Sequence, residues 1–132
     1  PRRGVLVSKM SEQSPQTEIF YLPVRIYIED TDAGGIVFYA NYLKYFERAR
    51  TEFIRDKGYE LRSSLAENIS FVVHSLEVKY LRSARLDDVI HVTAVLEKIA
   101  KTFLVFKQTV LDLNQHKPYR LIPHFHPIKL EI

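Results

Sequence analysis

The sequence predicts a single α+β domain in which one long helix lies across one face of an antiparallel sheet. Its 132 residues fit one domain, and its 46% hydrophobic and 27% charged residues are typical of an ordinary globular protein. Several segments alternate polar and apolar residues, whereas one segment has helical periodicity. Short turns between the later strands require antiparallel pairing, and a single helix covers only one face of a sheet.

The first strand is predicted over residues 22–29, where Val24, Ile26 and Ile28 share one face. Residues 11–18 are polar, and residues 1–18 are expected to form a flexible extension, with Met10 as the natural start of translation. Residues 19–132 are expected to form the domain. The extension lacks the sustained apolar stretch of a secretory signal.

A helix of about 16 residues is predicted from residue 41, or roughly 24 Å at 1.5 Å per residue. Leu43, Phe46 and Phe53 recur at helical spacing. Asn41 is predicted to be the N-cap, and Gly58 the stop that follows the last turn. Four aromatic side chains near the helix start are expected to fill the core, with the lining of a pocket as the alternative: Phe38, Tyr42, Tyr45 and Phe46.

Three more strands are predicted over residues 69–81, 89–98 and 103–112, in a meander with a turn at residues 83–88. The tail, residues 114–132, is atypical because Pro123 and Pro127 interrupt what could have been a strand, and only residues 128–132 alternate cleanly. If the last strand is missing, one edge of the sheet is left unpaired.

Composition excludes several classes of function. The chain has no cysteine, which excludes disulfides, thiolate metal sites and cysteine nucleophiles. A net charge of +3 is too weak to predict nucleic-acid binding, and no apolar window approaches the ~18 residues of a membrane span. Two basic clusters are interpreted as solvated faces, with a phosphorylated ligand as the alternative: Lys79, Arg82 and Arg85, and Arg48, Arg50 and Arg55.

No metal site is predicted. Asp30 and Asp32 have the first spacing of a calcium loop, but the later ligand positions of that loop carry unsuitable residues. His124 and His126 could begin a zinc site, yet no further ligand has convincing spacing. Aspartyl-phosphate chemistry is disfavoured because its D-x-D motif usually follows a strand buried on both faces. The strand predicted here alternates, with Arg25 and Glu29 on its polar face.

The stretch "EDTDAGGIVFYANY", residues 29–42, carries the most chemistry. A carboxylate at the end of a strand can act as a general base or a nucleophile. A glycine pair before a helix lets backbone N–H groups point into a site, where the helix dipole favours a negative oxygen. The alternative is an acidic turn whose glycines supply only backbone freedom.

Two longer stretches carry a resemblance to a known family. "VRIYIEDTDAGGIVFYANYLKYFERARTEFIRDKGY" and "FVVHSLEVKYLRSARLDDVI", with "KTFLVFKQTV", resemble the hotdog-fold acyl-CoA thioesterases. The likeness spans residues 22–112 and is to the Tol–Pal-associated YbgC branch, which is related to 4-hydroxybenzoyl-CoA thioesterase.

The resemblance implies a hotdog fold, with dimers or tetramers whose active sites lie at the dimer interface, and hydrolysis of acyl-CoA without metal or cofactor. It implies Asp32 as the catalytic carboxylate and the N–H of Tyr39 as the oxyanion donor. YbgC-type members usually carry His where this chain has Tyr39, so a second catalytic role of that side chain is not carried over. The implied substrate-binding residues are Gly35, Ile36, Val37, Asn41, Tyr42 and Lys101.

Two hypotheses follow. The first is a cytoplasmic acyl-CoA thioesterase, and the sequence leaves open whether Asp32 activates water or attacks the thioester. The second is a non-catalytic hotdog module that binds acyl-CoA or acyl carrier protein.

Overall fold

The computed structural model describes residues 19–58, 71–112 and 120–131. These residues form one sheet, one α-helix and one short 3-10 helix, and no helix among them is long and apolar enough to cross a membrane. The helices are η1 (Ile28–Asp30) and α2 (Asn41–Asp56). The strands are β1 (Phe20–Arg25), β2 (Val72–Lys79), β3 (Val89–Ile99), β4 (Phe103–Lys107), β5 (Thr109–Asp112) and β6 (Arg120–Glu131).

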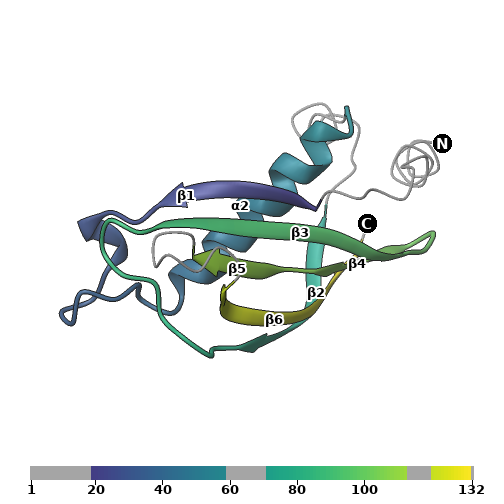
Figure 1. Cartoon of the computed structure of the whole chain (residues 1–132). Helices are drawn as coiled ribbons and strands as arrows, with labels where there is room; N and C mark the ends of the chain where they lie inside the picture. Colours follow the sequence, from purple (N-terminus) through teal and green to yellow (C-terminus); the bar gives the residue numbers. More distant parts are fainter. Residues whose placement is uncertain (1–18, 59–70, 113–119, 132) are drawn as a thin grey trace.

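All pairings in the sheet are antiparallel, as predicted, and the strand order is β1-β3-β4-β6-β2 (Figure 1). The strand predicted over residues 103–112 is present but interrupted at Gln108. Its second half, β5, pairs with β3 on one side and β6 on the other. The long strand β3 therefore runs beside β4 and β5 in turn.

The predicted meander is wrong at β2. This strand does not pair with β3 but lies at the opposite edge of the sheet, next to β6. The connecting residues 80–88 do not form a tight hairpin. They cross the molecule and bridge the loop before the helix, where Ile36 pairs with Arg85. The strands β2 and β3 are thus neighbours in the sequence but not in the sheet.

The expectation for the tail is also wrong. Residues 120–131 form the long strand β6, which lies between β4 and β2 and so leaves no gap in the sheet. The register of β6 skips Pro123 and Pro127, because it moves from Leu121 to His124 against β5 and from Phe125 to Ile128 against β2. Irregular pairing at these points allows a strand to contain residues that lack an N–H.

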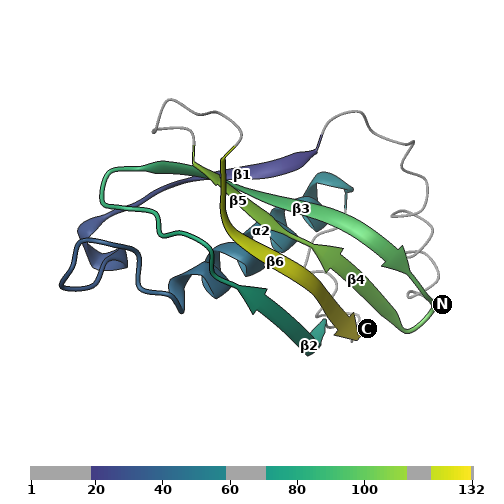
Figure 2. The ribbon, with the colours of Figure 1, turned by 60° about the horizontal axis from the view of Figure 1, so that its bottom comes forward.

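The helix α2 crosses one face of the sheet and packs against β1 and β3, as predicted (Figure 2). Its buried stripe supplies much of the core, which explains the period of the sequence pattern. The helix ends at Asp56, and Gly58 follows the C-cap residue, as predicted. Its φ of +83° is the left-handed conformation expected after the end of a helix. The N-cap is Ala40 and not Asn41, which is the first helical residue. The buried helix residues are Tyr42, Tyr45, Phe46, Ala49, Arg50, Phe53 and Ile54.

The first strand is shorter than predicted. It ends at Arg25, and the next residues turn into η1, which leaves Ile28 75% exposed. The carboxylate of Asp30 accepts a hydrogen bond from the N–H of Tyr27 at 2.8 Å. A short acidic side chain can satisfy a backbone donor in this way and compete with the strand. The turn of η1 aims the following residues toward the helix start.

Arg50 is not on a solvated face, contrary to prediction, because only 8% of it is exposed. Its Nη1 donates to Oε1 of Gln108 at 2.9 Å. Nε2 of Gln108 in turn donates to the carbonyls of Phe46 and Thr93 at 3.0 and 3.1 Å. Burial lowers the pKa of Arg50 to about 10. This polar network joins the helix to the interruption between β4 and β5, and a buried network is stabilising only when its members are paired.

Candidate active site

Asp32 lies in a tight turn that the sequence around it builds. Its N–H donates to the carbonyl of Ile36 at 2.9 Å, and its carbonyl accepts from the N–H of Gly35 at 3.1 Å. Its Oδ1 accepts from the N–H of Gly34 at 2.8 Å. Gly35 has a φ of +76°, a region that favours glycine. The carboxylate is therefore held at one oxygen while the side chain remains exposed to solvent.

Hydrogen bonds connect the loop around Asp32 to the start of α2 and to the residues before β3. The carbonyl of Asp30 accepts hydrogen bonds from the N–H of Phe38 at 3.0 Å and from Nδ2 of Asn41 at 2.9 Å. On the other side, the N–H of Val37 donates to the carbonyl of Ala84 at 2.9 Å. The residues between Asp32 and the helix consequently have few ways to move independently.

Tyr39 lies just before α2, at the end of the helix where the backbone dipole is positive. Its side chain is 62% exposed, and its N–H forms no hydrogen bond with the described residues. An unpaired N–H at a helix start is available to a negative oxygen. The loop that holds Asp32 leads directly to this donor.

Tyrosine side chains support the helix start from the connection after β2. The hydroxyl of Tyr80 donates to the carbonyl of Tyr39 at 3.1 Å, and its ring lies edge-on to the ring of Tyr39. Burial, and then the nearby Tyr39, raise the pKa of Tyr80. The hydroxyl of the buried Tyr42 accepts a hydrogen bond from the N–H of Ala84 at 2.9 Å. Both contacts tie the first turn of α2 to residues 80–84.

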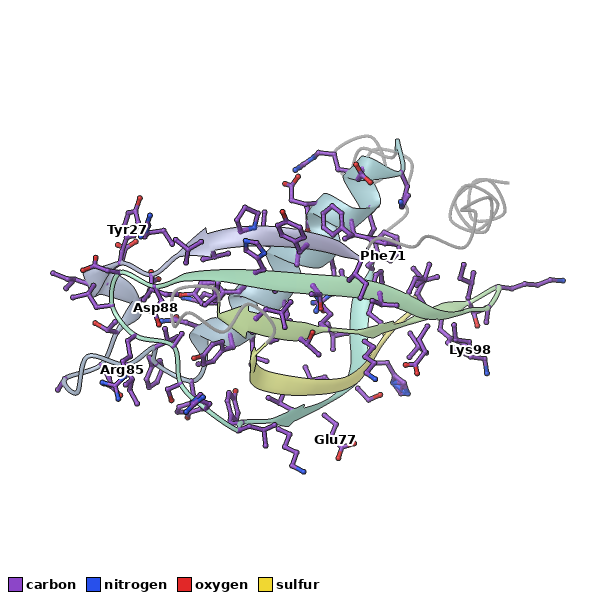
Figure 3. All side chains as sticks on the ribbon, in the orientation of Figure 1. Tyr27, Phe71, Glu77, Arg85, Asp88 and Lys98 are labelled. Atoms are coloured by element: carbon purple, nitrogen blue, oxygen red, sulfur yellow. The ribbon has the colours of Figure 1, made fainter. Side chains whose placement is uncertain are left out.

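The predicted site residues separate into two groups. One group lies between the Asp32 turn and the first turn of α2: Asp32, Gly35, Ile36, Val37, Tyr39, Asn41 and Tyr42. Lys101 is outside it, because it lies in the turn between β3 and β4, beyond the far end of β3. Figure 3 shows Tyr27, Arg85 and Asp88 at one end of the molecule and Lys98 at the other. The 11 residues of β3 separate these ends by about 35 Å.

Sequence reasoning missed the supporting residues Tyr80 and Ala84, and the anchoring role of Asp30. Ala84 has no side-chain chemistry, and its role comes from its backbone alone. Tyr80 was visible only as one member of an alternating strand. The D-x-D spacing was a usable signal for Asp30, since both carboxylates make short local hydrogen bonds to backbone N–H groups.

Among the residues that the structure describes, no group of three or more His, Asp or Glu side chains could hold a metal ion. The side chains of His124 and His126 lie outside this description, so the zinc alternative is not tested by it.

The comparisons with known proteins agree on one family. The model of the Thioesterase superfamily matches residues 34–119, more than half of the chain. The chain is 42% identical over 96 residues to the acyl-CoA thioester hydrolase YbgC of Escherichia coli O6:H1, covering 73% of this chain and 72% of that protein. It is 41% identical over 93 residues to the acyl-CoA thioesterase YbgC of Haemophilus influenzae, covering 70% and 68% of the two chains.

The solved structure of 4-hydroxybenzoyl-CoA thioesterase from Pseudomonas sp. strain CBS-3 matches with a TM-score of 0.76. Its sequence identity is 20%, and the match covers 84% of this chain and 82% of that one. At this identity the likeness bears on the fold alone, and it confirms the expected antiparallel sheet with one long helix. The chain therefore has the hotdog fold and belongs to the thioesterase superfamily.

Proposed function

We propose that this protein hydrolyses acyl-CoA thioesters, with Asp32 as the catalytic carboxylate and the N–H of Tyr39 as the oxyanion donor. Two features of one loop carry the proposal. The exposed carboxylate of Asp32 is held by a backbone N–H, and the N–H of Tyr39, at the start of the adjoining helix, has no partner among the described residues. The relatives that bear the name of acyl-CoA thioester hydrolases support the substrate class.

The reaction needs a nucleophile and a place for negative charge. In the general-base route, Asp32 takes a proton from water while the water oxygen attacks the thioester carbon. The carbonyl oxygen then becomes an oxyanion, which accepts a hydrogen bond from the N–H of Tyr39. Collapse of this intermediate breaks the carbon–sulfur bond, and the proton held by Asp32 passes to the CoA thiolate. The products are a free acid and CoA.

In the alternative route, Asp32 attacks the thioester carbon, the carbon–sulfur bond breaks and CoA leaves as the thiolate, which takes up a proton from solvent. The resulting anhydride is then hydrolysed by water. The two routes differ in the source of the oxygen in the product. A single turnover in ¹⁸O-water places label in the acid by the general-base route. By the anhydride route with attack on the aspartyl carbon, the label enters Asp32 instead, and mass spectrometry of the protein detects it.

We propose that the active form is a homodimer joined at the free edge of β2, or a homotetramer made of two such dimers. Among the described strands, β2 pairs only with β6, so its other edge is open. Its apolar side chains are exposed, with Val72 at 59% and Val73 and Leu76 at 43% each. An exposed apolar edge strand favours pairing with another chain.

A second copy also bears on the role of Lys101. Within one chain, Lys101 lies far from Asp32. We therefore propose that Lys101 of one subunit contacts the CoA that is bound at Asp32 of the other subunit. A basic side chain there suits the phosphate groups of CoA.

CoA thioesters are cytoplasmic metabolites, which is why we propose the cytoplasm as the location of this protein.

The test is thiol release from a panel of acyl-CoAs, followed with a colorimetric thiol reagent. The protein contains no cysteine and contributes no thiol signal of its own. Release that depends on Asp32 supports the enzyme. Binding of acyl-CoA or of acylated acyl carrier protein without release, by folded and oligomeric protein, supports the non-catalytic module instead.

A further inference from the structure

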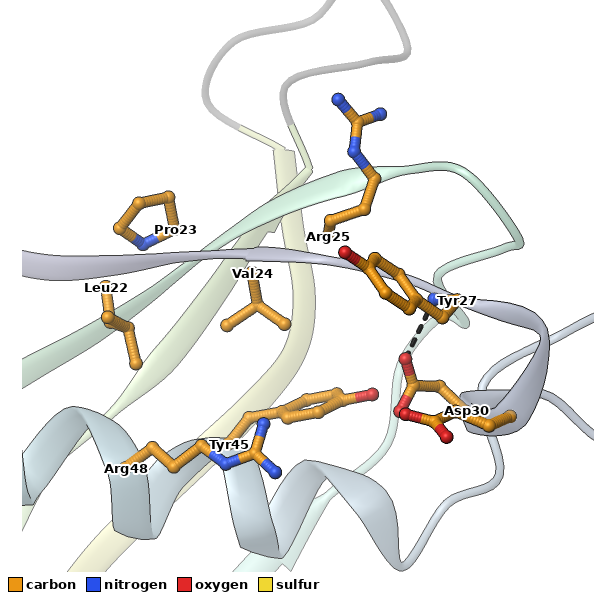
Figure 4. Close-up of a pocket in the computed structure, with 9 residues that line it drawn as sticks. Leu22, Pro23, Val24, Arg25, Tyr27, Asp30, Tyr45 and Arg48 are labelled. Atoms are coloured by element: carbon orange, nitrogen blue, oxygen red, sulfur yellow. Dashed lines mark hydrogen bonds between the residues drawn. The ribbon is translucent and has the colours of Figure 1, made fainter.

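A cleft lies between the edge strand β1 and the helix α2. Its volume is about 320 Å³. Figure 4 shows Leu22 and Val24 of β1 above it, the ring of Tyr45 along it, and Asp30 at one end. The cleft includes neither Asp32 nor Tyr39, so it is not explained by thioester hydrolysis.

The buried hydroxyl of Tyr45 interacts with the carboxylate of Asp30 but has no well-formed hydrogen bond among the described residues. Tyr45 is 2% exposed, and its hydroxyl forms no hydrogen bond of normal geometry with the described residues. It points along the cleft toward Asp30 (Figure 4). Burial, and then the carboxylate of Asp30, raise the pKa of Tyr45, so the hydroxyl keeps its proton and can both donate and accept. A buried polar group without a partner costs stability, and a ligand can supply that partner.

The end of the cleft around this hydroxyl is acidic. Asp30 lies at this end, and Glu29 also lines the cleft. One oxygen of Asp30 accepts a hydrogen bond from the N–H of Tyr27 at 2.8 Å, and the same carboxylate interacts with the hydroxyl of Tyr45. A carboxylate beside a tyrosine hydroxyl, with a second carboxylate in the same cleft, favours a group that donates several hydrogen bonds and carries positive charge. A primary ammonium group has this chemistry.

The guanidinium group of Arg48 brings a positive charge to the ring of Tyr45. The guanidinium carbon of Arg48 is 5.9 Å from the ring centroid of Tyr45, and this side chain forms no ion pair within the described residues. Arg25 also lines the cleft, but its Nη1 donates to the carbonyl of Asp87 at 2.7 Å. Arg48 is therefore the arginine available to an anionic group, since guanidinium binds carboxylate and phosphate well.

The edge of β1 favours a small molecule over an added peptide strand. β1 pairs only with β3 among the described strands, so its other side faces the cleft. Pro23 lies in the middle of β1 and has no N–H to offer. Proline in an edge strand blocks the continuous pairing that an added strand requires.

We propose that this cleft binds a small zwitterion with a primary ammonium group and an anionic group joined by a short apolar stem. The ammonium group donates to Asp30 and to the hydroxyl of Tyr45. The anionic group accepts from Arg48. The stem lies against the ring of Tyr45, Leu22 and Val24.

The experiment is a ¹H–¹⁵N chemical-shift titration of the full chain with 4-aminobutyrate, 5-aminovalerate and 6-aminohexanoate. Matched probes that carry one charge only are n-butylamine and butyrate. We expect saturable shifts around residues 22–30 and 45–48 with at least one of the zwitterions, and weaker binding of both single-charge probes.

Tyr45→Phe removes only a hydroxyl that makes no well-formed hydrogen bond within the described residues, so the variant is expected to fold. We expect its affinity for the preferred zwitterion to fall at least about tenfold, because it loses a buried hydrogen bond to a charged group. Arg48→Gln changes an exposed side chain and is expected to abolish the preference for a zwitterion over the amine. Tyr21→Phe is the matched control, because Tyr21 of β1 is 49% exposed and stacks on His91 instead.

Three results overturn the proposal. One is the absence of saturable shifts in the cleft with all three zwitterions. Another is equal affinity for n-butylamine and the best zwitterion, which removes Arg48 from the site. The third is unchanged affinity in Tyr45→Phe while the variant remains folded.

Discussion

Replacement of Asp32 by asparagine separates the chemistry of this residue from its place in the turn. Oδ1 of Asp32 accepts a hydrogen bond from the N–H of Gly34 at 2.8 Å. The side-chain oxygen of asparagine can accept the same bond, and the side chain is exposed. We therefore expect Asp32→Asn to retain the loop and to change the free energy of unfolding by at most about 1 kcal/mol.

The effect on catalysis is expected to be much larger. Asparagine cannot take a proton from water at neutral pH and is a poor nucleophile. General-base assistance contributes about 10²–10⁴ in rate. At about 1.36 kcal/mol for each tenfold change, the loss corresponds to roughly 2.7–5.5 kcal/mol in the activation barrier. The difference between the two energies is what distinguishes a catalytic carboxylate from a structural one.

The assay compares thiol release by wild type, Asp32→Asn and the control Glu29→Gln, which removes an exposed carboxylate three residues earlier. Urea unfolding of each protein gives its stability. We expect a kcat loss of at least about 10² for Asp32→Asn and near-wild-type activity for Glu29→Gln. Activity of a folded Asp32→Asn within a few-fold of wild type would refute the assignment. Loss of folding in this variant would refute the account of the turn.

Four further outcomes are expected. Gly35→Ala should lower the free energy of unfolding by about 1–2 kcal/mol in urea titrations, through left-handed backbone strain alone, because its Cβ meets nothing within 4 Å. Tyr42→Phe should cost about 1–3 kcal/mol in the same measurement, since it leaves the N–H of Ala84 without its partner. The raised pKa of Tyr45 means that above pH ~10 the unfolded chain releases a proton that the folded chain keeps, so stability falls as pH rises; unfolding at several pH values should show a shallower fall in Tyr45→Phe. Leu76→Glu should produce monomers in light-scattering chromatography and reduce thiol release, and an unchanged dimer would exclude the β2 edge.

Local patterns predicted well those elements whose neighbours in space are also neighbours in sequence. The helix was predicted with its correct length and its stop at Gly58, because helical bonds and the left-handed glycine involve residues a few positions apart. Its N-cap was wrong by one residue. Asn41 is the first residue of the helix and does not cap it, because its side chain donates a hydrogen bond to the carbonyl of Asp30, 11 residues earlier.

Long-range pairing was predicted poorly. The tail was expected to break at its prolines, yet residues 120–131 pair with β4, β5 and β2. Three neighbours supply enough backbone partners for a strand that its own sequence disfavours, because β propensity depends strongly on context. Arg50 was expected to be exposed for a similar reason, since its partner Gln108 is 58 residues away.

By itself, the sequence determined the helix, most of the strands, and the short stretch that contains Asp32, two glycines and Tyr39. These depend on bonds and periodicities that span a few residues. Only the tertiary structure decided that β2 lies at the far edge beside β6, that residues 80–84 support the helix start, and that Lys101 is remote from Asp32. It also placed the buried hydroxyl of Tyr45 beside Asp30 in a cleft against β1. Such relations depend on which surfaces the folded chain brings together, and no local pattern encodes them.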